Sequence, residues 1–269
     1  MTRLCQRYGV TRGGYYAWRG RRPSARTIQD RQLARRITQL FRQHDRRYGS
    51  PRIHRDLRAE GWRISRRRVE RLMRAAALHA RVSQIYRANP RLHRFYGQHP
   101  NRLWRRVVRR PDQVWVGDIT YLPVGRHWRF LAVVLDRYSR RVLAWGLSRT
   151  RDGRLTRAVL DAALRRRRPR RGLIFHSDRG TEYVTAALRD RLRACGIRQS
   201  ATRVATPGDN AHMESFFHSL KAELIHGRRF TTDTQLRLAL RRYMRYYNHR
   251  RRHSALQYRA PAVFESCAA

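Results

Sequence analysis

The sequence predicts a mixed α/β domain preceded by a separate helical segment. Up to residue 80, apolar side chains recur at helical spacing. From residue 113, three β-branched and aromatic runs are followed by alternating helical and strand-like stretches, with acidic residues at or near strand ends. The expected parts are a helical region (1–80), a basic linker (81–112), an α/β core (113–226) and a C-terminal helix with a basic tail (227–269).

The N-terminal region is expected to contain several short helices. Residues 1–20 favour a short helical piece with Thr11 as an N-cap, and residues 26–43 have the apolar spacing of a longer helix. Residues 44–80 indicate a further pair of helices, the second capped by Ser65. This arrangement is typical of a helix-turn-helix segment.

Arginines coat the second helix of that pair. Arg66, Arg67 and Arg71 lie on its expected polar side. Such a row suits a helix that reads DNA, and it equally suits a solvated basic face. The sequence leaves both interpretations open, and we carry these arginines forward as candidate DNA contacts.

The core is expected to alternate strands and helices in the order βββαβαβα. Turn residues between the first three runs favour antiparallel strands, and Gly196 is expected to end a helix. Asp136, which ends one of these runs before a turn, is expected to have a structural role. The predicted strands are 113–124, 128–136, 140–148, 173–176 and 197–202, and the predicted helices are 154–166, 184–195, 209–226 and 232–248.

Composition points to a nucleic-acid partner. The net charge is +45 and the sequence pI is about 11.9, so the chain repels itself unless it meets a polyanion. A coding bias explains why arginine replaces lysine, but it explains the excess of basic over acidic residues less well. Cys5, Cys195 and Cys267 form neither a disulfide nor a zinc pattern. Without a signal peptide or an apolar span, we expect a soluble cytoplasmic protein that associates with the nucleoid.

Three acidic residues and one lysine form the main candidate site. Asp118 and Asp178 stand in strand-like settings, and 35 residues lie between Asp178 and Glu214. Lys221, the only lysine, follows Glu214 by about two helical turns, so the two share a face with Asn210. Magnesium binds oxygen ligands such as carboxylates. In phosphodiester transfer, one metal ion activates the attacking oxygen and a second stabilises the leaving oxygen. The sequence therefore indicates metal-dependent phosphoryl transfer on nucleic acid.

The motifs around these residues resemble the integrase catalytic core of bacterial insertion-sequence transposases, in the second-frame (OrfB) group related to retroviral integrases. Other stretches resemble the C-terminal and helix-turn-helix segments of that family. The core motifs are Trp115-Val-Gly-Asp118-Ile-Thr-Tyr, His176-Ser-Asp178-Arg-Gly-Thr-Glu-Tyr183 and Asp209-Asn-Ala-His-Met-Glu214-Ser-Phe-Phe-His-Ser-Leu-Lys221. The other stretches are Tyr247-Asn248, Arg252-His253-Ser254-Ala255-Leu256, Pro261, Tyr48-Gly49, Arg52-Ile53 and Val69-Glu-Arg-Leu-Met73. Glu182 and Ala205 depart from the family, which often has glutamine and glycine there.

The resemblance implies a ribonuclease-H-like integrase core with a mixed five-stranded sheet and flanking helices. It implies a DDE-type transposase that cleaves and joins DNA at the ends of an insertion element. Asp118, Asp178 and Glu214 would be both catalytic residues and metal ligands, and they would bind two Mg²⁺ ions, for which Mn²⁺ can substitute. Lys221 matches the basic residue that contacts DNA in the family.

Several partners are expected on the same basis. The chain should bind element ends and target DNA, act as a homo-oligomer on DNA, and use no membrane. Asn210, Arg252 and His253 are added to the candidate DNA contacts. Because residues 1–20 look like the end of an incomplete helix-turn-helix, we also expect an upstream-frame (OrfA) partner or fusion that supplies sequence specificity.

Two alternatives remain at this point. A nuclease with the same core would need the same acids, but it would not need the N-terminal helices or the stretch 252–256. A DNA-binding regulator with an inactive core would not need intact acids. A metal-dependent nicking assay separates the regulator from both enzymes.

Overall fold

A computed structural model describes residues 1–81, 101–103, 106–203 and 207–267. Contacts between residues divide the chain into two compact units, Met1–Arg81 and Val82–Ala269. Residues 82–100 and 104–105 of the expected linker lie outside the described residues, as does Ala205. Within the described ranges, no helix is both long and apolar enough to cross a membrane.

The N-terminal unit is helical, and two of its helices begin at the expected cap residues. Thr11 and Ser65 each accept a hydrogen bond from a backbone amide in the first turn of the helix that follows, and Gly61 turns the chain with a φ of +90°. The helices are α1 (Thr2–Arg7), α2 (Arg12–Arg19), α3 (Ala25–Gln43), α4 (Ser50–Ala59) and α5 (Arg66–Ala75). The last three pack through buried residues that include Leu33, Ile37, Ile53, Leu57, Val69 and Leu72.

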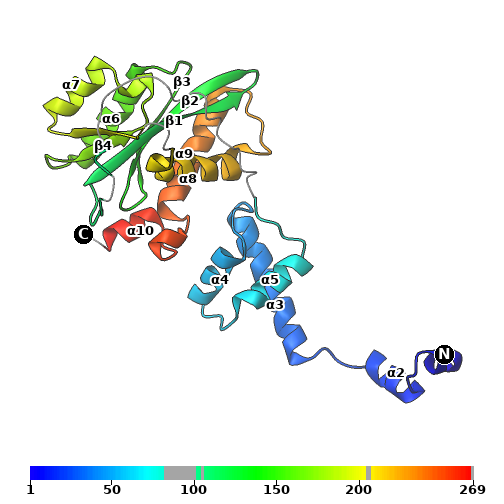
Figure 1. The fold of residues 1–269 in the computed structure, drawn as a ribbon. Helices are drawn as coiled ribbons and strands as arrows, with labels where there is room; N and C mark the ends of the chain where they lie inside the picture. Colours follow the sequence, from blue (N-terminus) through cyan, green and yellow to red (C-terminus); the bar gives the residue numbers. More distant parts are fainter. Residues whose placement is uncertain (82–100, 104–105, 204–206, 268–269) are drawn as a thin grey trace. The chain divides into compact units, whose positions relative to one another are not determined.

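The second unit contains the predicted five-stranded mixed sheet (Figure 1). The strands are β1 (Val114–Val124), β2 (His127–Asp136), β3 (Val142–Ser148), β4 (Ile174–Ser177) and β5 (Arg198–Ala201). Their order is β3-β2-β1-β4-β5. The first three strands are antiparallel, as predicted, whereas β4 and β5 run parallel to β1.

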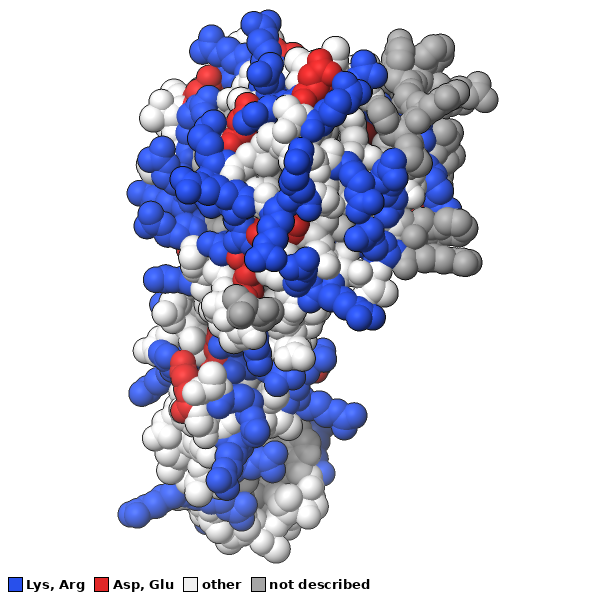
Figure 2. All heavy atoms as spheres, turned by 90° about the vertical axis from the view of Figure 1, so that its left-hand side faces the viewer, with Lys and Arg blue, Asp and Glu red and all other residues white. Residues whose placement is uncertain are grey.

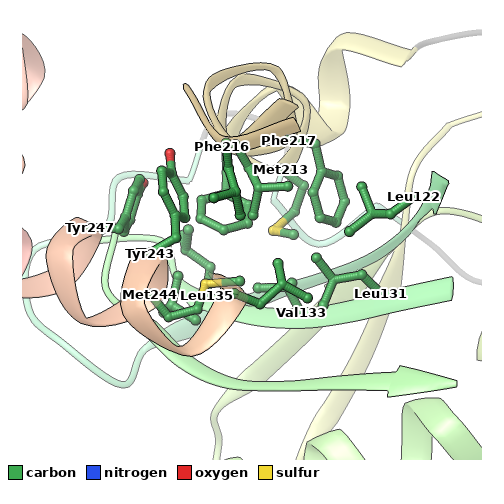
Figure 3. Close-up of a cluster of buried hydrophobic side chains, with 14 of the residues drawn as sticks. Leu122, Leu131, Val133, Leu135, Met213, Phe216, Phe217, Tyr243, Met244 and Tyr247 are labelled. Atoms are coloured by element: carbon green, nitrogen blue, oxygen red, sulfur yellow. The ribbon is translucent and has the colours of Figure 1, made fainter. Parts of the chain in front are cut away.

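Successive residues of a strand point to opposite faces of the sheet, and here both sets include apolar side chains. Helices therefore cover both faces of the sheet. One face packs against α6 (Gly153–Arg167) and α7 (Ala186–Ala194). The other packs against α8 (Ala211–Leu220) and α9 (Asp233–His249). In Figure 3, side chains of the sheet interlock with Met213, Phe216 and Phe217 from α8 and with Tyr243 and Met244 from α9.

Two features of the C-terminal part differ from expectation. The predicted helix 209–226 is α-helical only to Leu220 and continues as a π-helical segment, η4 (Lys221–Ile225). The residues expected as a basic tail fold against the core, with a 3₁₀ turn η5 (Ser254–Leu256) and helix α10 (Pro261–Ser266).

The folded tail is attached by a buried ion pair. Arg251 and Glu223 are 5% and 4% exposed, and Arg251 Nη2 lies 2.7 Å from Glu223 Oε1. Tyr243 donates a hydrogen bond to the same carboxylate (3.2 Å). The run of basic residues at the end of α9 is therefore partly an internal structural element.

Candidate active site

Asp118 lies within β1, where this strand loses one of its two neighbours. Only the first three residues of β1 pair with β4, whereas β2 follows β1 to its end. The residue before Asp118 must be small, since a Cβ atom on Gly117 would lie 2.7 Å from the ring of Phe175. The half-buried Asp118 carboxylate accepts a hydrogen bond from the amide of Ile119 (2.7 Å). The open strand edge and the fixed backbone hold this acid at one point of the sheet.

Asp178 directly follows β4, opposite Asp118. The parallel register pairs Val116 with His176, and each of these residues precedes its aspartate by two positions. The backbone therefore brings both acids to the same place on the sheet. Asp178 Oδ1 also accepts a hydrogen bond from the amide of Gly180 (3.0 Å), in a local turn that ends the strand.

The two aspartates interact electrostatically. Burial, and then the negative charge of Asp178, raise the pKa of Asp118 well above its usual range. Burial and the same two acids also raise the pKa of the neighbouring Tyr183 hydroxyl. Neighbouring carboxylates in such a setting repel each other until a proton or a cation reduces the repulsion.

A third carboxylate, Glu182, lies beside this pair and is neutralised by Arg151. Glu182 is 3% exposed, and its Oε1 accepts hydrogen bonds from Arg151 Nη2 (2.6 Å) and Nε (2.9 Å). The charge of Glu182 raises the pKa of Asp118, and the charge of Arg151 lowers it. A Cβ atom on Gly180 would lie 2.6 Å from Glu182 Oε1. Nothing in the sequence singled out Arg151, because it is one arginine among many.

Glu214 lies in the first turn of α8. It is exposed, while Met213 and Phe216 on the other side of the helix are buried, so the amphipathic division expected for this helix is present. In the part of the chain that the structure describes, no three His, Cys, Asp or Glu side chains form a group that could hold a metal ion. The structure brings Asp118 and Asp178 together but does not place Glu214 with them in such a group.

Lys221 belongs to the surroundings of Asp118. It is the first residue of η4, and its Nζ lies 4.7 Å from the centroid of the Tyr121 ring. Burial lowers the pKa of Lys221, and the charge of Asp118 acts in the opposite direction. The one lysine of the chain is thus half-buried beside an aromatic ring and one of the two paired acids.

Tyr121, whose ring lies beside Lys221, forms an exposed aromatic pair with Trp128, and neither was among the expected site residues. Tyr121 and Trp128 are both 56% exposed and form an edge-to-face pair with ring centroids 5.0 Å apart. Large exposed rings of this kind can stack on nucleobases. The alternation of residues along a strand predicts which face of the sheet Tyr121 and Trp128 occupy. It does not predict whether a helix covers that face.

Asn210, expected to contact DNA, lies inside the protein. It is 5% exposed, and neither its Nδ2 nor its Oδ1 has a hydrogen-bond partner among the described residues. His176 is also fully buried, and its Nδ1 lies 2.9 Å from Ser200 Oγ. In this conformation, Asn210 could reach DNA only after a local rearrangement.

The arginines expected on α5 lie in two kinds of environment. Arg66 pairs with Glu70 (2.8 Å), and Arg71 pairs with Asp30 (2.5 Å). Arg67 is exposed, and its side chain makes no ion pair within the described part of this unit. The row is therefore partly committed to contacts within the N-terminal unit.

The two candidates near the C-terminus brace the folded tail. Arg252 Nη1 donates a hydrogen bond to the carbonyl of Tyr258 (3.2 Å). The ring of His253 packs edge-on against Tyr247, with centroids 4.8 Å apart. Both side chains are half-buried, so their contacts are at least in part structural.

Basic side chains are abundant on the surface of the protein. Figure 2 shows Lys and Arg spread over one face of the molecule, with few acidic side chains among them. Such a surface suits a polyanionic partner.

Family comparisons agree with this architecture. Models described as "Integrase core domain" match residues 108–207 and 195–261, and a model described as "HTH-like domain" matches residues 28–86. These matches cover both units of the chain.

Similar proteins include bacterial transposases. The transposase for insertion sequence element IS904 of Lactococcus lactis subsp. lactis is 34% identical over 91% of this chain and 98% of its own length. Transposase InsF for insertion sequence IS3A of Escherichia coli is 36% identical over 98% and 93%, respectively. Among solved structures, a chain of the simian T-cell lymphotropic virus intasome is 16% identical, with a TM-score of 0.51 over 85% of this chain and 74% of that one. This last likeness concerns the fold alone.

Proposed function

Because the chain belongs to the IS3 family of insertion-sequence transposases, we propose that it cleaves the ends of an insertion element and joins them to target DNA by phosphoryl transfer. The observation that carries this proposal is the pairing of Asp118 with Asp178, where β1 and β4 separate, and the approach of Lys221 to Asp118. A DNA-binding regulator with an inactive core would have no need for such a pair.

The chemistry of the paired acids fits a divalent cation. Burial and then the negative charge of Asp178 raise the pKa of Asp118, and a bound cation would offset both effects. We assign Asp118 and Asp178 as ligands of Mg²⁺, which Mn²⁺ can replace, and Glu214 as a third ligand that joins them on the loaded enzyme. When bound, a pair of such ions activates the attacking oxygen and stabilises the leaving one.

The remaining side chains would position DNA around the acids. Burial lowers the pKa of Lys221, and the charge of Asp118 opposes this effect; in its charged form the Lys221 ammonium group would donate to an oxygen of the reacting phosphate. Arg151 neutralises Glu182, so that Glu182 does not compete with the paired aspartates for cations. In this scheme the chain binds and orients DNA, and the acids hold the reacting centre.

The wider assignments follow from the family and the charge. The partners would be element ends and target DNA, bound by a homo-oligomer that works with an upstream-frame partner or fusion. The HTH-like match at residues 28–86 and the net charge of +45 support DNA binding. Action on chromosomal DNA implies a cytoplasmic, nucleoid-associated location.

The test is strand cleavage and joining by Asp118→Asn, Asp178→Asn and Glu214→Gln, each of which removes a ligand charge with little change of shape. Each should lose joining by orders of magnitude while keeping its affinity for DNA. Asp190→Asn, which alters an exposed acid with 68% side-chain exposure, is the matched control. Near-normal joining by any one of the three would remove that residue from the site. Cleavage without any joining by the parent chain would favour the nuclease alternative.

A further inference from the structure

A basic cavity lies at the end of the sheet that is remote from the paired acids. Its volume is about 690 Å³, and Gln113 and Leu173, which immediately precede β1 and β4, form part of its wall. Six arginines also line it: Arg106, Arg110, Arg167, Arg168, Arg170 and Arg171. They come from two stretches that are distant in the sequence, so the fold brings them together.

The acidic residues of this cavity are already paired. Arg167 binds Asp112 through Nη2 (2.7 Å) and Glu265 through Nη1 (2.5 Å). Glu265 also pairs with Arg141 (2.7 Å). Burial lowers the pKa of Arg167, but its two acidic partners outweigh that effect and raise it overall.

The other five arginines have no such partner. Within the described part of the chain, their guanidinium groups form no ion pair or hydrogen bond, and all five residues are exposed. Several uncompensated positive charges around one cavity repel one another, and a ligand with several negative charges relieves that repulsion. The planar guanidinium group matches the geometry of phosphate oxygens.

We propose that this cavity binds the phosphodiester backbone of DNA at a second site, separate from the catalytic acids. Gln113 and Leu173 each precede an aspartate of the pair by five residues, which corresponds to about 16 Å along an extended strand. Phosphates bound here are therefore not the ones that react at Asp118 and Asp178. The inference rests on the proposed function, and it adds a second segment of DNA held by the same protein unit.

A charge-matched pair of variants tests this site in the full-length chain. The cavity variant combines Arg110→Gln, Arg168→Gln, Arg170→Gln and Arg171→Gln. The control variant combines Arg189→Gln, Arg241→Gln, Arg242→Gln and Arg245→Gln, which are exposed arginines on α7 and α9 without side-chain partners among the described residues. Both variants lose the same charge from exposed positions, so both should remain folded, as thermal unfolding can verify.

The measurement is binding of a duplex of about 40 base pairs, roughly four helical turns, over a range of salt concentrations. Each lost phosphate contact reduces the slope of log affinity against log salt by about 0.9. We expect the cavity variant to lose about 2 or more from this slope and the control to lose less than about 1. Equal losses in both variants would show that the arginines act only through net charge. A cavity effect seen with duplex RNA but not with DNA would also overturn the assignment.

The result can be separated from that of the proposed function. Asp118→Asn should abolish joining. It should leave the slope of log affinity against log salt unchanged, because residue 118 lies outside the cavity. An unchanged slope in the cavity variant, together with loss of joining in Asp118→Asn, would overturn the second site alone. Normal joining by Asp118→Asn would overturn the proposed function, even where the cavity variant shows its expected loss.

Discussion

Removing Arg251 should destabilise the second unit (Val82–Ala269) far more than removing an exposed arginine. The side chains of Arg251 and Glu223 are 6% and 5% exposed, and Arg251 also contacts Glu223 through Nε (2.9 Å). In an Arg251→Leu variant, Glu223 remains buried with its charge uncompensated, and Tyr243 is one remaining donor. Breaking a buried pair from one side costs about 3–5 kcal/mol. An exposed pair is worth about 1 kcal/mol or less.

The assay is urea unfolding of the full-length chain, followed by hydrogen exchange of amides in α8 and α9. Arg193→Leu is the control, because the Arg193–Asp190 pair is 81% and 68% exposed. A double variant, Glu223→Leu with Arg251→Leu, replaces the pair by apolar groups and should recover most of the loss. A cost below about 1 kcal/mol for Arg251→Leu, or a double variant no more stable than the single one, would refute this reasoning.

Three further outcomes are expected. Mg²⁺ or Mn²⁺ should support joining and Ca²⁺ should support mainly DNA binding, because Ca²⁺ takes the same oxygens at longer distances; full joining in EDTA would contradict this. Lys221→Ala should slow single-turnover strand transfer by about tenfold or more, with Lys221→Arg intermediate and equilibrium DNA binding unchanged; equal rates for parent and Lys221→Arg would mean that only the charge matters. Burial raises the pKa of Asp136 from 3.8 to about 6. As the pH falls, Asp136 is therefore protonated in the folded chain at a higher pH than in the unfolded chain. When the pH is lowered from 7 to 4.5, the free energy of unfolding of the parent chain should therefore rise by about 2 kcal/mol relative to that of Asp136→Asn. Urea titrations showing no such difference between the two proteins would exclude this effect.

Much of the fold can be predicted from local patterns. The helices of the N-terminal unit begin at Thr11 and Ser65 because hydroxyl caps satisfy free amides, and this signal is local in the sequence. The antiparallel pairing of β1 to β3 follows from short turns between alternating runs. Asp136 has the expected structural role, since its carboxylate accepts hydrogen bonds from the amides of Tyr138 and Ser139.

The rest depends on contacts between distant segments. The parallel register that places Asp178 opposite Asp118 is invisible to periodicity, and only the resemblance to integrase cores suggested it. The Arg151–Glu182 pair joins residues 31 positions apart, and one arginine looks like any other in so basic a chain. The burial of Arg251 could not be predicted either, because a run of basic residues usually indicates a solvent-exposed surface.

The unique lysine makes the candidate site chemically addressable. Reagents that acylate primary amines have one side-chain target in this chain, Lys221, besides the amino terminus. The lowered pKa of Lys221 increases the fraction of reactive free amine. A lysine-specific protease likewise has a single bond to cut, between Lys221 and Ala222, inside the π-helical segment. Protection of that bond from cleavage reports whether η4 stays folded. Binding of DNA or metal ions at the site can therefore be detected on the unmodified protein, without a fluorophore or an introduced cysteine.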